Sequence, residues 1–149
     1  MSRDFDLARQ TIIDHYENPR NKINKTKALK IKYTKGHNDL PSCIDNIDAY
    51  VKIKNKRIVD LKFSGIGCAI CTSSTDIMSI ILKNKTIKKA KEIIDNYNKM
   101  ILGKKFNKST LKKLFFYRNV HKQPNRIKCA LVGIQAIENA IKKYEKIKQ

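Results

Sequence analysis

Residues 47–63 read IDAYVKIKNKRIVDLKF, and the pattern of this stretch decides the fold. In its first half, apolar side chains alternate with polar or amphipathic ones, and the apolar positions are Ile47, Ala49, Val51 and Ile53. Asn55 and Lys56 form a turn signal, and residues 58–63 repeat the alternation. Alternation of this kind is typical of strands that bury one face. The stretch therefore predicts an antiparallel hairpin with one face in the core.

Beyond the hairpin, the hydrophobic period changes from that of a strand to that of a helix. Residues 72–76 read TSSTD and are rich in helix-capping residue types, and residues 73–76 fit a capping box that opens a helix through Leu82. Thr86 is expected to cap the next helix, which ends near Gly103. We therefore predict two helices directly after the hairpin.

Two further helices are predicted near the C-terminus. Ser109 or Thr110 is expected to cap a short helix that contains Leu111 and Leu114. Pro124 starts the last helix, whose apolar positions form one stripe: Ile127, Leu131, Ile134, Ile137, Ile141 and Tyr144. A stripe of this kind packs one face of a helix against a core.

The segment before the hairpin is expected to add a helix and a strand. Residues 6–17 have apolar side chains at helical spacing, and Asn18-Pro19 ends that helix. Residues 27–33 alternate and predict a strand, and residues 36–42 predict a loop. Early strands and late helices indicate an α+β fold, in which helices cover one face of a small antiparallel sheet of about three strands. We expect a single domain over residues 1–149.

The composition is that of a basic globular protein with 149 residues and a formal net charge of +20. The charge excess is mostly lysine spread along the chain and is not interleaved with aromatic residues, which favours a solvated surface over a nucleic-acid-binding platform. No apolar run is long enough to span a membrane, and the N-terminus lacks a signal-peptide pattern. We therefore expect a cytoplasmic protein, in which four cysteines serve metal binding or catalysis rather than disulfides.

Three cysteines and one aspartate stand at the ends of predicted elements: Cys43, Asp45, Cys68 and Cys129. Three thiolates and one carboxylate fill a tetrahedral shell that zinc or iron accepts. A single cysteine is more often a buried small hydrophobe than a ligand. Cys68 and Cys129, however, both precede predicted helix starts, where backbone N–H groups favour a thiolate. The four positions together predict a metal site that the fold assembles from separate loops.

The remaining cysteine and the histidines have other expected roles. Cys71 completes a Cys-Ala-Ile-Cys pair with Cys68, but no thioredoxin-like context surrounds the pair, and we expect Cys71 to pack in the first turn of its helix. His15, His37 and His121 are scattered, and we expect surface or capping roles for them. Of the three, His121, before the last helix, is the one exception that we keep as a candidate ligand.

Four motifs occur in order along nearly the whole chain. Residues 13–21 read IDHYENPRN, residues 42–45 read SCID, residues 63–70 read FSGIGCAI, and residues 126–130 read RIKCA. Jointly they resemble the motifs of the NifU N-terminal/IscU/SufU family of iron–sulfur cluster assembly proteins. The long segment between the last two motifs, and the lysine before Cys129, resemble the SufU branch more than the IscU branch. Ile44 stands where the family has glycine, and Cys71 stands where it usually has serine.

The resemblance implies an α+β domain in which Cys43, Asp45, Cys68 and Cys129 bind one metal, which is zinc in SufU-like proteins. It implies that Cys43 accepts sulfane sulfur from a SufS-like cysteine desulfurase and passes it toward downstream iron–sulfur assembly proteins. Such a protein is at most a zinc-dependent sulfurtransferase-type carrier. Arg126 matches a family arginine beside the site and is expected to hold the freed thiolate or carboxylate. Zinc suits this chemistry because it keeps a thiolate deprotonated and is redox-inert.

Two alternatives remain open from the sequence. The first is a scaffold that assembles and transfers a [2Fe–2S] cluster, since cysteine and aspartate can also hold such a cluster. The second is a basic nucleic-acid-binding module that contains a structural zinc ion. We expect no membrane partner.

Overall fold

The computed structural model describes residues 2–38 and 45–148. Its elements follow the chain in this order: α1 (Ser2–Glu17), α2 (Lys25–Lys30), β1 (Thr34–His37), β2 (Asn46–Lys54), β3 (Arg57–Ile66), α3 (Ala69–Leu82), α4 (Ile87–Ile101), the 3-10 helices η1 (Lys112–Tyr117) and η2 (Val120–Lys122), and α5 (Pro124–Lys148).

The sheet has three strands in the order β1-β2-β3, and both pairs are antiparallel. β2 and β3 form the hairpin that residues 47–63 predict. Asn55 and Lys56 both have positive φ, 51° and 61°, which gives a two-residue turn whose twist matches that of the strands. The predicted inward positions of β2 are buried: Ile47, Ala49, Val51 and Ile53.

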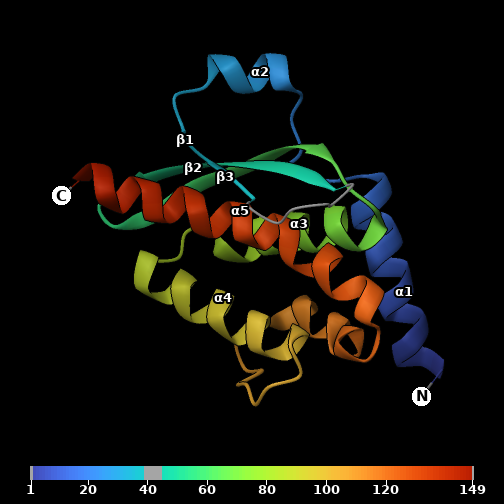
Figure 1. Ribbon diagram of the computed structural model, residues 1–149. Coiled ribbons are helices and arrows are strands. Elements are labelled where there is room, and N and C mark those ends of the chain that lie inside the picture. The colour runs from blue at the N-terminus through green and yellow to red at the C-terminus, as the bar shows by residue number, and fades with distance from the viewer. Residues whose placement is uncertain (1, 39–44, 149) are drawn as a thin grey trace.

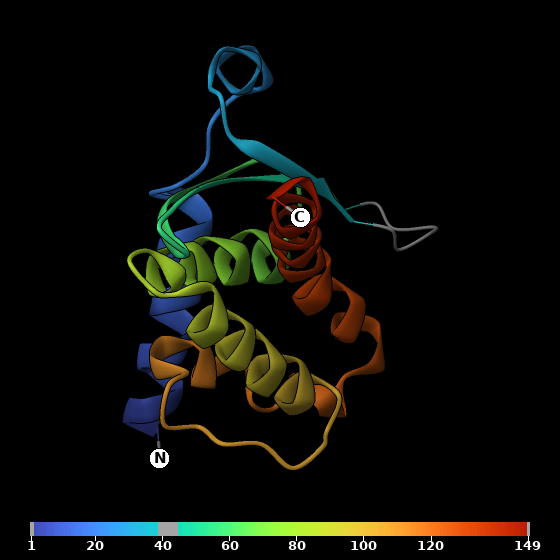
Figure 2. The same ribbon diagram turned by 90° about the vertical axis from the view of Figure 1, so that its left-hand side faces the viewer.

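Helices cover one face of this sheet, as the sequence predicts. α5 lies along β1 and β2, and α3 contacts both α5 and β3 (Figure 1). Two views at right angles show α4 in a further layer beyond α3 and α5, on the side away from the sheet (Figures 1 and 2). The short helix α2 stands alone on the opposite side of the sheet in both views. The fold is therefore α+β, with its core between the sheet and the layer formed by α3 and α5.

The prediction of a strand over residues 27–33 is wrong, because most of this segment forms α2. Oδ1 of Asn24 accepts a hydrogen bond from the backbone N of Lys27 at 2.7 Å and caps the helix. Ala28 is buried, but Leu29 is 89% exposed, so the alternating pattern does not mark a buried face. Lysine, alanine and leucine are good helix formers, and the cap adds to that local preference.

The predicted loop over residues 36–42 is wrong at its start, because Gly36 and His37 belong to β1. Gly36 lies against α5, and a Cβ atom built on it would lie 2.2 Å from both the carbonyl O of Ala136 and the backbone N of Ala140. A glycine therefore lets the edge strand approach the helix backbone closely. Residues 39–42 of the predicted loop lie outside the described residues.

α3 begins at Ala69, before the segment that the sequence marks as its cap, although it ends at Leu82 as predicted. Residues 72–76 lie inside the helix and are buried. Ser74 and Thr75 donate their hydroxyls to the carbonyl O of Cys71, at 3.2 Å and 2.7 Å. Hydroxyls that bond their own helix can be buried without loss of a partner, so a run of capping residue types need not mark a helix start.

Three of the other helices agree with their sequence signals, whereas the short helix lacks its predicted cap. α1 ends at Glu17, Oγ1 of Thr86 caps α4 by accepting from the backbone N of Lys89, and α5 begins at Pro124. The short helix after residue 110 is the 3-10 helix η1, and neither Ser109 nor Thr110 caps it, since Leu111 occupies the cap position. Among the described residues, no helix has the length and apolarity that a membrane crossing requires.

His15 is buried, which contradicts the expected surface or capping role. Its Nδ1 lies 2.6 Å from Oδ2 of Asp76, and both side chains are at most 5% exposed. Oδ1 of Asp76 also accepts from the backbone N of Asn21 at 2.9 Å and from its side-chain amide at 3.1 Å. One buried carboxylate on α3 thus fixes α1 and the segment that follows it, which holds the N-terminal helix against the core.

Candidate metal centre

Three of the four predicted ligands meet at one end of the sheet. The ligand atoms of Asp45, Cys68 and Cys129 all lie within 4.8 Å of one another. Asp45 directly precedes β2, Cys68 is the N-cap residue of α3, and Cys129 lies in the second turn of α5. Cys43, two residues before Asp45, lies outside the described residues, as does Ile44. Three separate elements therefore build the described part of the site.

The hairpin brings Asp45 to Cys68. Asn46 pairs with Ile66, so the start of β2 lies beside the end of β3. Oδ1 of Asp45 accepts a hydrogen bond from the backbone N of Cys68 at 2.9 Å, and its Oδ2 lies 3.7 Å from Sγ of Cys68. Gly65 has φ of 115°, and a Cβ there would lie 2.0 Å from the carbonyl O of Asn46, so only glycine fits this strand end.

The close packing of α5 on α3 brings Cys129 to the same place. Gly133, one helical turn after Cys129, faces Thr75 of α3, and a Cβ on it would lie 1.6 Å from Oγ1 of Thr75. The hydroxyl of Tyr97 on α4 donates to the carbonyl O of Ala130 at 2.9 Å and ties down the turn that carries Cys129. The expectation that Cys129 precedes a helix start is wrong, because α5 begins at Pro124, where its own sequence signal predicts, and Cys129 lies in its second turn.

The electrostatics of the three groups call for a cation. Burial, and then the hydrogen bonding and charges of Cys68 and Asp45, raise the pKa of the Cys129 thiol to about 12. The backbone N of Cys71 lies 3.5 Å from Sγ of Cys68 and points a helix N–H at that sulfur. Without a cation, the site therefore holds at least one proton that a metal would displace.

The donor set and its spacing fit zinc. Two sulfurs at the usual Zn–S distance of about 2.3 Å in a tetrahedral shell lie about 3.8 Å apart. An oxygen and a sulfur in such a shell lie about 3.6 Å apart, and the 3.7 Å separation of Asp45 Oδ2 and Cys68 Sγ is close to that value. All three ligand atoms lie within 4.8 Å of one another, so a small contraction of the cluster would bring each to bonding distance of one ion. The three described residues would hold the ion. Cys43, the fourth predicted ligand, lies outside the described residues.

The other candidate residues lie near the site or apart from it. Arg126 is exposed in the first turn of α5, one turn before Cys129. Cys71 is fully buried in the first turn of α3, as expected. His37 hydrogen-bonds Asp48, and Nδ1 of His121 lies 2.8 Å from the carbonyl O of Arg118, so neither belongs to the cluster of described ligands. The sequence did not predict that Cys68 caps α3; only its position just before the helix could have indicated this role.

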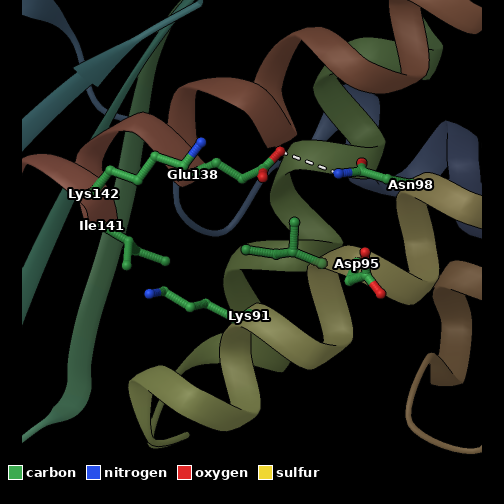
Figure 3. A pocket seen from close by; sticks show the side chains of 7 residues that line it. Lys91, Asp95, Asn98, Glu138, Ile141 and Lys142 are labelled. Atoms are coloured by element: carbon green, nitrogen blue, oxygen red, sulfur yellow. Dashed lines mark hydrogen bonds between the residues drawn. The ribbon is translucent and has the colours of Figure 1, made fainter.

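A hollow lies between α4 and α5, apart from the metal centre. Its walls carry Lys91, Asp95, Asn98, Glu138 and Lys142, and the amide of Asn98 donates to Glu138 at 3.1 Å (Figure 3). Glu138 follows Cys129 by nine residues, which places it about 14 Å further along α5. The oppositely charged side chains that line this hollow are typical of a solvated helix pair. The described residues that line it include no thiol.

The comparisons with known proteins agree with this geometry. The sequence model of the NifU-like N terminal domain family matches residues 7–149. The chain is 34% identical to the zinc-dependent sulfurtransferase SufU of Bacillus subtilis (strain 168), over 93% of this chain and 92% of that protein. It is 28% identical to the iron–sulfur cluster assembly scaffold protein IscU of Thermotoga maritima, over 70% of this chain and 74% of that protein. The crystal structure of FiSufU from Fervidobacterium islandicum AW-1 matches with a TM-score of 0.78 and 29% identity, covering 88% of this chain and 93% of that one.

Proposed function

Because the chain belongs to the NifU-like N terminal domain family, we propose that it is an iron–sulfur cluster assembly protein that binds one zinc ion and carries sulfur. The observation that supports this function best is the convergence of Asp45, Cys68 and Cys129 within 4.8 Å. A relative that is 34% identical over 93% of this chain is named a zinc-dependent sulfurtransferase, and that name agrees with a site that contains two cysteines and one aspartate.

Cys43 is the sulfur acceptor in this proposal. Its thiolate attacks the outer sulfur of a persulfide on a cysteine desulfurase, the S–S bond breaks, and the cysteine of the desulfurase leaves as a thiolate. Cys43 then carries the persulfide sulfur toward downstream iron–sulfur assembly proteins. Zinc, when bound, keeps the thiolates deprotonated and does not oxidise them.

The described residues prepare the site for this transfer. Asp45 is held by the backbone N–H of Cys68, so its second oxygen faces the metal position. Cys68 is fixed as the N-cap residue of α3 and Cys129 lies within α5, and Cys43 stands two residues before Asp45 in the sequence. Arg126 supplies a cation one helical turn from Cys129 and is assigned to hold the thiolate or carboxylate that leaves the metal.

Loss of the acceptor thiol tests the proposal. The Cys43→Ser variant should abolish the stimulation of a cysteine desulfurase, because a hydroxyl is not a comparable nucleophile toward sulfane sulfur. The matched control Cys71→Ser should leave the stimulation nearly unchanged, since Cys71 is buried in the core. The measurement is sulfide release by the desulfurase with each variant in excess. Equal loss in both variants would contradict the assignment of Cys43.

A [2Fe–2S] scaffold is the second candidate function, because the chain also matches a protein named as an IscU scaffold. Two thiolates and a carboxylate can hold such a cluster as well as a zinc ion. Metal analysis of protein purified without added iron separates the two functions. A colourless protein with one zinc per chain supports the carrier, and a brown protein with iron and acid-labile sulfide supports the scaffold.

A further inference from the structure

Cys68 and Cys71 form a Cys-Ala-Ile-Cys pair at the start of α3, and the proposed function uses only Cys68. Cys68 is the N-cap residue, and its Sγ lies 3.5 Å from the backbone N of Cys71. The sulfur of Cys68 is therefore placed over the turn that carries Cys71.

The side chain of Cys71 points back toward the same end of the helix. A Cβ built on Gly67 would lie 2.8 Å from Sγ of Cys71 and 3.0 Å from its Cβ. Because Gly67 directly precedes Cys68, the two cysteine side chains border the same short stretch of backbone. Helix geometry places Cα atoms three residues apart at about 5 Å. That separation lies inside the range of about 4.4–6.8 Å that a disulfide needs.

The two thiols differ in access. Cys68 is half-buried at the metal centre, whereas Cys71 is fully buried and has no surface exposed to solvent. An oxidant in solution therefore meets Cys68 first, and Cys71 can react only with a group that is already beside it. This asymmetry is that of an attacked thiol and a resolving thiol.

We propose that Cys68 and Cys71 close to an intramolecular disulfide when the metal-free protein meets a hydroperoxide, and that this bridge blocks metal uptake. The sulfur of Cys68 attacks the peroxide, the O–O bond breaks, and a sulfenic acid forms with release of water or an alcohol. The sulfur of Cys71 then attacks the sulfur of Cys68, the S–O bond breaks, and water leaves with the proton of Cys71. Two thiols lose two electrons in total, and one hydroperoxide gains them.

The consequence for metal uptake rests on the proposed metal site. A bridged Cys68 has no thiolate to offer, so two of the three described ligands remain. Bound zinc has the opposite effect, because it occupies the Cys68 sulfur that the peroxide would attack. The metal and the bridge therefore exclude each other, which makes metal loading sensitive to peroxide.

Peptide mapping tests the bridge directly. The full-length protein is reduced, stripped of metal with a chelator, checked for its fold by circular dichroism and treated with one equivalent of hydrogen peroxide. Trypsin cleaves after Lys62 and Lys83, and residues 63–83 then contain Cys68 and Cys71 but neither of the other cysteines. We expect this peptide to lose two hydrogens and to resist alkylation. Protein loaded with zinc beforehand should give the peptide alkylated at both cysteines.

Two variants and a metal titration complete the test. Cys71→Ser should give a sulfenic acid at Cys68 that dimedone traps, and Cys129→Ser should still form the bridge. Linkage of Cys68 to Cys43 or Cys129 in the wild-type protein, or a peptide that stays doubly alkylated, would overturn the proposal. A bridged protein that binds zinc as fully as the reduced protein would overturn the proposed block. Zinc uptake by the reduced protein in the same titration tests the proposed function separately. If the reduced protein binds no zinc, the proposed function is wrong, but the bridge found by peptide mapping still stands.

Discussion

Cys68 and Cys129 each have a second role in the fold beside that of a ligand: one caps α3, and the other lies where α5 meets α3. We expect Cys68→Ser and Cys129→Ser to lose the metal and to melt at a lower temperature than the metal-loaded wild-type protein, because an assembled site couples metal binding to folding. Cys71→Ser serves as the control and should keep the metal. Zinc content per chain and thermal unfolding measure both effects. Full metal occupancy in both ligand variants would show that the assignment is wrong.

The raised pKa of Cys129, about 12, predicts how metal binding depends on pH. The thiol is protonated in the metal-free protein at neutral pH and must lose its proton to bind a metal, so the apparent affinity should rise with pH, about tenfold per pH unit for each proton released. A pH indicator in weakly buffered solution should report proton release when zinc is added. Cys129→Ser should release fewer protons. Zinc binding without proton release would contradict the prediction that a protonated Cys129 thiol loses its proton to bind the metal.

At the scale of secondary structure, the contact between α3 and α5 places Cys129. Gly133→Ala would put a Cβ 1.6 Å from Oγ1 of Thr75, and overpacking of this kind typically costs about 1–3 kcal/mol. We expect lower stability in urea together with weaker zinc binding, because the helix must shift. Adding Thr75→Ala removes Oγ1 and Cγ2 but keeps the Cβ of residue 75 at 2.8 Å, so it should recover part of both losses. Gly133→Ala with unchanged stability and affinity would show that this contact does not position the ligand.

At the scale of the whole molecule, the net charge of +20 is spread over lysines on the surface. We expect weak binding to a labelled DNA duplex that vanishes steeply with added salt, because contacts to phosphates alone release counterions and carry no base specificity. Salt should slow association with a desulfurase only modestly, since screening shortens the reach of the field to about 8 Å at physiological ionic strength. Tight, sequence-dependent binding near physiological salt would favour the nucleic-acid-binding alternative.

The sequence by itself determined the elements whose signals are local. The hairpin of β2 and β3, the start of α5 at Pro124 and the cap of α4 at Thr86 all depend on residues within a few positions of one another. Backbone preferences, turn geometry and periodic burial act over that range, so a pattern in the sequence is enough to predict them. The ligand types of the candidate site could also be predicted, because Asp45, Cys68 and Cys129 occur within motifs that resemble one family.

The tertiary structure alone decided what depends on distant neighbours. Residues 27–33 alternate as a strand would, yet the segment is mostly helical, and the capping types at 72–76 are buried inside α3. His15 pairs with Asp76, 61 residues away, and the sequence around neither residue predicts this contact. The meeting of the three ligands depends on two glycines that let backbones approach: Gly65, where the hairpin brings Asp45 to Cys68, and Gly133, where α5 brings Cys129 to α3. Burial and close packing are properties of the assembled core, because each requires a partner from another part of the chain.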